Sequence, residues 1–121
     1  MAAPNLVNVS TITAKSLQAA LTTTLTTELL ANAAASGKVF KVNNIIVANI
    51  DGSNAADVSL FITKSGGSPI AIASTISVPA DSTLVAIDKN SSIYLEEGDN
   101  IEGGAGADND LVVTINYEEL S

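Results

Sequence analysis

The residues with the best spacing for chemistry are acidic and amide side chains gathered in three short segments. Each segment offers several oxygen atoms, and the members are Asp51, Asn54 and Asp57; Glu97, Asp99 and Asn100; and Asp108, Asn109 and Asp110. Calcium in proteins takes about six to eight such oxygens, which the loops of a β-sandwich can supply. None of the segments matches the EF-hand loop or the glycine-rich calcium repeat. Because Asp and Asn are also ordinary turn residues, we predict that these segments form turns and bind no metal.

Most catalytic roles lack a residue that could fill them. The chain contains no His, Cys or Arg, so the commonest general base, the thiolate nucleophile and the bidentate anion clamp are missing. Glu96 and Glu97 are adjacent on an expected strand, where successive side chains point to opposite faces. We therefore predict that the protein is not an enzyme and has no catalytic or cofactor-binding residues.

One glycine-rich segment has the composition of a phosphate-binding loop. Gly103, Gly104 and Gly106 lie close together, but the Lys-Ser/Thr ending of that loop is missing and no helical pattern follows. We expect a flexible, irregular connection from Gly103 to Asp110.

Charge and aromatic content exclude several classes of partner. The 121 residues include 5 basic and 13 acidic residues, which gives a formal net charge of −8. A nucleic-acid binder needs a basic surface, and an anionic membrane would repel this chain. Aromatic residues make up only 3% of the chain, so stacking platforms for sugars or bases are nearly absent. The acidity indicates either simple solubility or a basic partner.

Alternating apolar and polar residues predict strands through much of the chain. Between Val39 and Ile50, the residues expected to share a face are Phe40, Val42, Asn44, Ile46, Ala48 and Ile50. The corresponding faces of later strands are Val58, Leu60 and Ile62; Ile70, Ile72, Ile76 and Val78; and Leu111, Val113, Ile115 and Tyr117. We predict a core that includes Leu60, Ile62, Ile76, Leu84, Leu95, Val113 and Ile115.

The N-terminal third allows two interpretations. Its leucines recur every four residues, as on one face of a helix, at Leu17, Leu21, Leu25 and Leu29. The interleaved threonines favour strands instead, because β-branched side chains lose rotamer freedom in helices. We therefore predict strands near Val9–Leu21 and Leu25–Leu30, and a single helical turn over Ala31–Ser36 that Gly37 ends.

These elements predict one domain, an all-β antiparallel sandwich of about eight strands over residues 14–121. Residues 1–13, with Pro4 and little patterning, are expected to form an extended arm. Met1–Asn5 lacks the basic and apolar regions of a signal peptide, and no apolar run approaches the roughly 20 residues of a membrane-spanning helix. We expect a soluble protein made in the cytosol.

Four strings give the chain a resemblance to a known group of proteins. They are Val42–Gly52, Ile76–Leu84, Ile93–Asp99 and Val113–Leu120. With them, the chain resembles small virion proteins of tailed bacteriophages, particularly those that infect cyanobacteria and other marine bacteria. The resemblance implies a jelly-roll-like sandwich without a catalytic site.

The same resemblance implies a role in the virion. The expected function is to decorate and stabilise the capsid shell as a cement protein, with the major capsid protein and further copies of this chain, in a homotrimer, as partners. Residues 1–13 would then lie across a neighbouring subunit by strand addition. The expected location is the capsid surface of a virion, after synthesis in the host cytoplasm. An adaptor or fibre-attachment protein of the neck or tail is the first alternative, and a calcium-dependent carbohydrate-binding module is the second.

Overall fold

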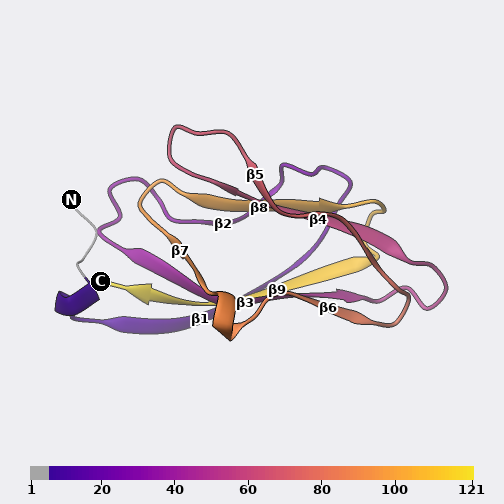
Figure 1. Ribbon diagram of the computed structural model, residues 1–121, viewed down its shortest axis with the longest axis horizontal. Helices are drawn as coiled ribbons and strands as arrows, with labels where there is room; N and C mark the ends of the chain where they lie inside the picture. Colours follow the sequence, from indigo (N-terminus) through magenta and orange to yellow (C-terminus); the bar gives the residue numbers. More distant parts are fainter. Residues whose placement is uncertain (1–5) are drawn as a thin grey trace.

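Two antiparallel sheets packed face to face make up the part of the chain that the computed structural model describes, residues 6–121 (Figure 1). Two 3₁₀ helices, η1 (Leu6–Asn8) and η2 (Lys89–Ser91), accompany the strands. The strands are β1 (Ile12–Ala20), β2 (Glu28–Ala31), β3 (Val39–Asn49), β4 (Ala56–Thr63), β5 (Ile70–Val78), β6 (Thr83–Ile87), β7 (Ile93–Leu95), β8 (Asn100–Ala105) and β9 (Leu111–Leu120). Within these residues, no helix is long and apolar enough to cross a membrane.

The strand order is that of a jelly roll. One sheet runs β1-β9-β3-β6, with the short β7 also paired to β3, and the other runs β2-β8-β4-β5. The pairs are nested along the chain: β4 pairs with β5, β3 with β6, β2 with β8 and β1 with β9. A long hairpin folded over on itself produces this order. The predicted all-β antiparallel sandwich is confirmed, and β7 is the strand beyond the eight of the jelly roll.

The core lies between the two sheets and confirms most of the predicted core residues. Leu60, Leu95, Val113 and Ile115 are fully buried. Ile62 and Leu84 are partly buried and pack against the core. Ile76 was predicted wrongly, because its side chain is 40% exposed. Ile76 pairs with the buried Val58 of β4, and side chains of paired residues lie on the same face of a sheet. Ile76 therefore faces inward, but it is exposed because β5 is an edge strand of its sheet.

A bulge in β3 overturns the face predicted for that strand. The register against β9 shifts between Val42 and Asn44, so that one extra residue enters β3. An extra residue reverses the alternation of faces beyond it. Before the bulge, Phe40 and Val42 are buried as predicted. Beyond it, the buried residues are Ile45, Val47 and Asn49. The prediction of Asn44, Ile46, Ala48 and Ile50 on the inner face is therefore wrong.

The N-terminal third contains two strands and no long helix, but residues 22–27, whose threonines favoured strands, form the connection between β1 and β2. The second predicted strand, Leu25–Leu30, is therefore shorter and later, at Glu28–Ala31. β1 pairs with β9 without interruption from Ile12 opposite Leu120 to Ala20 opposite Val112. Ile12 and Thr13, predicted to belong to the arm, therefore belong to the sheet. The rest of the arm includes residues 1–5, which lie outside the described residues.

No helical turn forms over Ala31–Ser36, so that prediction is wrong. Ala31 ends β2, and a turn follows in which Ala35 and Gly37 have positive φ angles of 59° and 72°. The left-handed conformation of two nearby residues is incompatible with a helix.

The segment expected to be a flexible loop from Gly103 begins as a strand. Gly103 and Gly104 belong to β8, and each has a neighbour where a side chain would stand. A Cβ on Gly103 would lie 2.7 Å from Leu60 Cδ2, and one on Gly104 would lie 2.7 Å from the carbonyl oxygen of Thr24. Glycine is required here because the β1–β2 connection crosses the outer face of β8 at close range.

Replacing Gly104 with alanine should destabilise the protein by about 1–3 kcal/mol, because the added methyl group collides with backbone atoms that cannot move freely. Gly106→Ala is the matched control, since its Cβ would meet no atom closer than 3.7 Å. We expect it to be neutral or slightly stabilising. Urea denaturation of both variants measures the effect, and equal losses of stability would contradict the close-approach explanation.

Candidate functional site

The first acidic segment stabilises its own turn. Asp51 Oδ1 accepts hydrogen bonds from the backbone N–H groups of Ser53 at 2.8 Å and Asn54 at 3.4 Å. The hydrogen bond from Ser53 is the main reason that the pKa of Asp51 lies below its ordinary value. Asp57 lies in β4 and not in this turn.

The third segment also supports a loop. Asp108 Oδ1 accepts a hydrogen bond from the backbone N–H of Thr23 at 2.9 Å, which ties the β8–β9 turn to the β1–β2 connection. Among residues 6–121, no three acidic side chains are arranged to hold a metal ion. The side chains therefore do what turn residues do, and the absence of bound metal stays a prediction.

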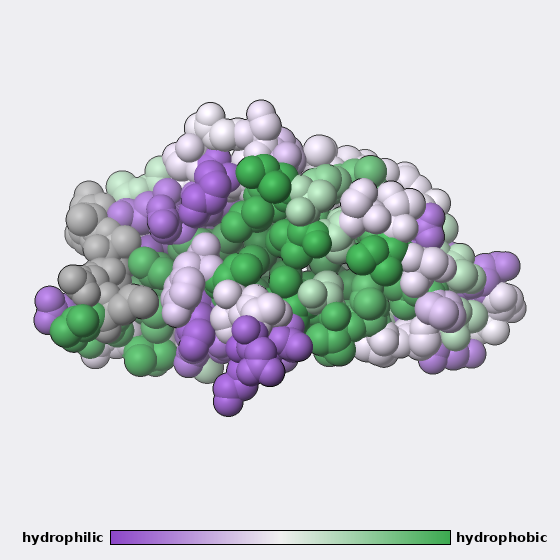
Figure 2. Space-filling model, viewed as in Figure 1, coloured by the Kyte–Doolittle hydropathy of each residue, from purple (hydrophilic) through white to green (hydrophobic). Residues whose placement is uncertain are grey.

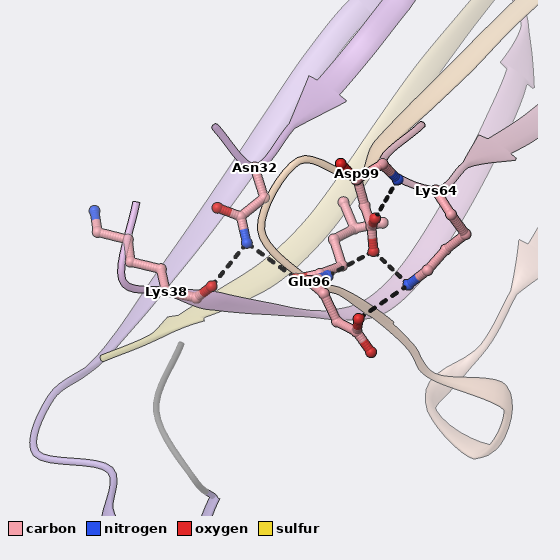
Figure 3. Close-up of polar contacts among 7 residues, drawn as sticks. Asn32, Lys38, Lys64, Glu96 and Asp99 are labelled. Carbon is pink, nitrogen blue, oxygen red and sulfur yellow. Dashed lines mark hydrogen bonds and ion pairs between the residues drawn. The ribbon is translucent and has the colours of Figure 1, made fainter. Parts of the chain in front are cut away.

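The second segment forms a buried polar corner around Asp99 (Figure 3). Asp99 is 2% exposed, and its Oδ1 accepts a hydrogen bond from the backbone N–H of Ser65 at 3.0 Å. Its Oδ2 accepts one from the backbone N–H of Glu96 at 2.8 Å and forms an ion pair with the Lys64 ammonium group. Glu96 lies at the rim, with Oε2 3.7 Å from Lys64 Nζ. The corner therefore fastens the turn after β7 to the end of β4.

The same contacts set the ionisation of the corner. Burial opposes the charged form of Asp99, but the hydrogen bonds from Lys64, Ser65 and Glu96 outweigh it and lower the pKa of the carboxyl group. The hydrogen bond to Asp99 in turn raises the pKa of Lys64. Both groups are thus held in their charged forms at neutral pH, and neither is poised to exchange a proton.

Two buried asparagines, which the sequence did not reveal, hold the ends of the sandwich. Asn32 Nδ2 donates to the carbonyl oxygens of Lys38 at 2.8 Å and Leu95 at 3.0 Å, beside the Asp99 corner (Figure 3). Asn49 Nδ2 donates to the carbonyl oxygens of Asn54 at 3.0 Å and Val78 at 2.8 Å. Each amide thus joins backbone segments far apart in the sequence, which is a structural task.

The surface also has two shallow hollows. One, of about 280 Å³, lies beside the bulge of β5, and its lining includes Thr23, Leu25, Asp57, Ser59 and Thr75. The Ser59 hydroxyl oxygen accepts a hydrogen bond from the backbone N–H of Thr75 at 3.0 Å, which fixes the bulge. The other, of about 350 Å³, follows β1 and β9. Acyl transfer needs a nucleophile hydrogen-bonded to a base, and glycosyl transfer needs a pair of carboxyl groups. Neither arrangement is present among the residues that line these two hollows.

The most distinctive surface is the side of the sandwich formed by β5, β6 and β7. There the inward faces of three edge strands reach solvent, and the residues are Ile70, Ile72 and Ile76 of β5, Leu84 of β6 and Ile93 of β7. Figure 2 shows the resulting band of hydrophobic side chains between the two layers. We call this set the open edge. Contiguous apolar surface of this kind is typical of a contact with another molecule.

The opposite side of the sandwich differs in character. There β1 carries Lys15, whose Nζ lies 3.2 Å from Glu119 Oε2, and Lys38 Nζ lies 3.0 Å from Glu119 Oε1. Charged side chains on an edge strand discourage pairing with other chains. The open edge therefore stands out by its composition as well as by its exposure.

No protein-family model matches the chain, and no curated protein is significantly similar to it. The fold, the open edge and the resemblance of the four strings are the features that bear on function.

The Asp99 corner should make the protein lose stability in acid. A carboxyl group whose pKa is lowered by folding contributes stability above its unfolded pKa of about 3.9 and loses it as pH falls through the folded pKa. Asp99→Asn should cost about 1–3 kcal/mol at pH 7 and should weaken the dependence of stability on pH below about 4. Part of that dependence will remain, because the pKa values of Asp51 and Glu119 are lowered as well.

Unfolding free energies measured between about pH 7 and pH 2 test this expectation. Glu96→Gln is the control, because its exposed pair with Lys64 should contribute little. An acid profile of Asp99→Asn that matches the unsubstituted protein would refute the role of this carboxylate.

Metal chelators should leave the melting temperature unchanged, because Asp51, Asp99 and Asp108 already accept hydrogen bonds from the protein. Differential scanning calorimetry with EDTA, then with excess calcium, measures this. A melting temperature that falls with EDTA and recovers with calcium would favour the carbohydrate-binding alternative over the turn interpretation.

Proposed function

We propose that the protein is a non-enzymatic virion structural protein that decorates and stabilises the capsid shell of a tailed bacteriophage. The observation that carries the proposal is the open edge on a jelly roll, because it offers a protein-binding surface on a fold that viral capsid domains use. Fold alone does not establish function, so the surface carries more weight than the topology.

The place of the four strings in the fold supports a structural reading of the resemblance. Val42–Gly52 covers most of β3, Val113–Leu120 covers most of β9 and Ile93–Asp99 contains β7. These three strands are neighbours in one sheet, in which β3 pairs with both β7 and β9. Ile76–Leu84 joins the two sheets across the end of β5 and the start of β6. The resemblance thus rests on residues that build the sandwich.

The hydrogen bonds of the buried polar side chains also support a structural role. All four buried polar side chains of residues 6–121, Asn32, Asn49, Ser59 and Asp99, form hydrogen bonds with the backbone. Groups committed to backbone contacts stabilise a scaffold and are not available for turnover. A rigid, thermally stable module is what a cement protein must be.

A cement protein stabilises a shell through thermodynamic linkage between binding and assembly. It binds the assembled shell and not the loosened one, and so it stabilises the shell by the free energy of that binding. On this proposal the partner is the major capsid protein, and the protein is located on the capsid surface after its synthesis in the host cytoplasm. Its acidic surface would suit basic patches on that partner.

Particles purified from a culture that produces the protein provide the test. Quantitative mass spectrometry should find the chain in a copy number comparable to that of the major capsid protein. Shells depleted of it should release their nucleic acid at a lower temperature, and adding purified chain back should restore the original temperature. A few copies per particle would favour the neck or tail alternative, and absence from particles would refute the virion role.

A further inference from the structure

The hollow beside the bulge of β5 brings together polar side chains from three parts of the chain. It lies on the outer face of the four-stranded sheet, and its lining includes Thr23 of the β1–β2 connection, Asp57 of β4 and Thr75 of β5. Asp57 points to this outer face, because the next residue, Val58, is fully buried in the core. The hollow therefore opens to solvent on the side of the sheet that faces away from the core.

The fold does not use the polar side-chain groups of this hollow. Within residues 6–121, the carboxylate of Asp57 forms no hydrogen bond and no ion pair, and the hydroxyl groups of Thr23 and Thr75 form no hydrogen bond. The carboxylates of Asp51 and Asp99, by contrast, accept hydrogen bonds from the backbone. A ligand can therefore bind to the groups in the hollow without breaking a contact of the protein.

The charge around the hollow is negative. No lysine lines it, and Asp108, which accepts a hydrogen bond from the backbone N–H of Thr23, places a second carboxylate nearby. Lys64 follows β4 at the opposite end from Asp57 and forms its own ion pairs there, so it does not neutralise the hollow. A cation in the hollow would gain electrostatic attraction without displacing an existing ion pair.

The lining favours an alkylammonium group over other cations. Calcium needs about six to eight oxygen ligands, and the hollow offers a single carboxylate. The sheet order β8-β4-β5 places Thr23, in the connection that crosses β8, and Thr75, in β5, on either side of Asp57 in β4. An ammonium group has three donors that can turn toward such separate acceptors, whereas a guanidinium group is a planar fork. Leu25, which is 42% exposed, can cover the methylene groups of the same side chain.

The backbone of Thr75 is held in a strained conformation beside the hollow. Its φ angle is 52°, in the left-handed region that a β-branched residue rarely adopts. The buried Ser59 hydroxyl oxygen accepts a hydrogen bond from the Thr75 N–H at 3.0 Å, which keeps Thr75 in this conformation. Glycine would fit this backbone with less strain, so threonine lowers stability here while it places a hydroxyl group in the hollow. Strain of this kind is typical of ligand sites.

From these observations we propose that the hollow binds the ammonium group of a lysine side chain that belongs to a partner protein. The Asp57 carboxylate forms the ion pair, the hydroxyl groups of Thr23 and Thr75 accept the further hydrogen bonds, and Leu25 covers the methylene chain. Because the hollow is shallow, it encloses the end of a side chain while the rest of the partner stays outside. The site is separate from the open edge, and it does not depend on the virion role.

An NMR titration of the isotope-labelled full chain with the blocked tripeptide acetyl-Gly-Lys-Gly-amide tests the proposal. The backbone amide signals around the hollow should shift with a dissociation constant of about 1–10 mM. Asp57→Asn should raise that constant at least about 10-fold. The same peptide with an acetylated lysine should not bind, because acetylation removes the charge. Asp81→Asn is the matched control, since it removes one charge from an exposed turn that does not line the hollow, and it should bind the peptide unchanged.

Thr75→Gly separates binding from folding. Relief of the backbone strain should raise the melting temperature by about 3–6 °C, whereas loss of one acceptor should raise the dissociation constant at least about 3-fold. A Thr75 that is only structural would change the first quantity and not the second. Shifts spread over the whole surface, unchanged binding by Asp57→Asn or Thr75→Gly, or tighter binding of the corresponding arginine peptide overturns the proposal. Because these measurements use the purified chain and the particle test uses virions, failure of one proposal is distinguishable from failure of the other.

Discussion

The pairing of β9 with β1 on one side and β3 on the other is the contact on which the rest of the structure depends. In the nested order of a jelly roll, the first and last strands meet only when all the strands between them have folded back. β9 supplies three fully buried side chains, Leu111, Val113 and Ile115, and its register with β1 is unbroken. The contacts that define the fold are therefore almost all distant in sequence, which favours slow, cooperative folding.

The strand order also determines which surfaces are left over. A five-stranded and a four-stranded layer that do not close into a barrel have two open sides. On the β1 side, Lys15, Lys38 and Glu119 supply charge, and the β1–β2 connection crosses over Gly104. On the β5 side, strands β5, β6 and β7 carry no charged side chain, and the charges lie in the turns, at Lys64, Asp88 and Lys89. The open edge is apolar because its strands carry no charged side chain, and under the proposed function it is the surface that contacts the partner.

The sequence predicted the buried face correctly in strands where apolar and polar residues alternate without interruption. In β9 the predicted face is the observed one for Leu111, Val113 and Ile115, because no residue is inserted between them. In β3 the same rule failed beyond Val42, because a bulge adds one residue and alternation alone contains no sign of it. The loop predicted from Gly103 is wrong for Gly103 and Gly104, which lie in β8. Glycine is needed there because Leu60 and Thr24 approach from elsewhere in the chain, which no local pattern reveals.

The polar groups were predictable in kind but not in partner. Asp51 and Asp108 stabilise turns and loops, as expected for residues of their type, whereas the ion pair of Asp99 with Lys64 joins residues 35 positions apart. No local pattern indicates such a pair, because the nested strand order alone brings the two turns together.

On the proposed function, the buried polar contacts favour binding of a partner at the side of the sandwich over binding at its ends. At one end Asn32 and Asp99 are bonded to backbone groups of other segments, and at the other end Asn49 is. Breaking such contacts to bind a ligand would leave buried groups unsatisfied, at a cost of about 1–3 kcal/mol for each group. The open edge carries no such cost, since its side chains gain burial and lose no hydrogen bond. Binding at the side therefore leaves the turns intact, and the domain can join an assembly without changing its own fold.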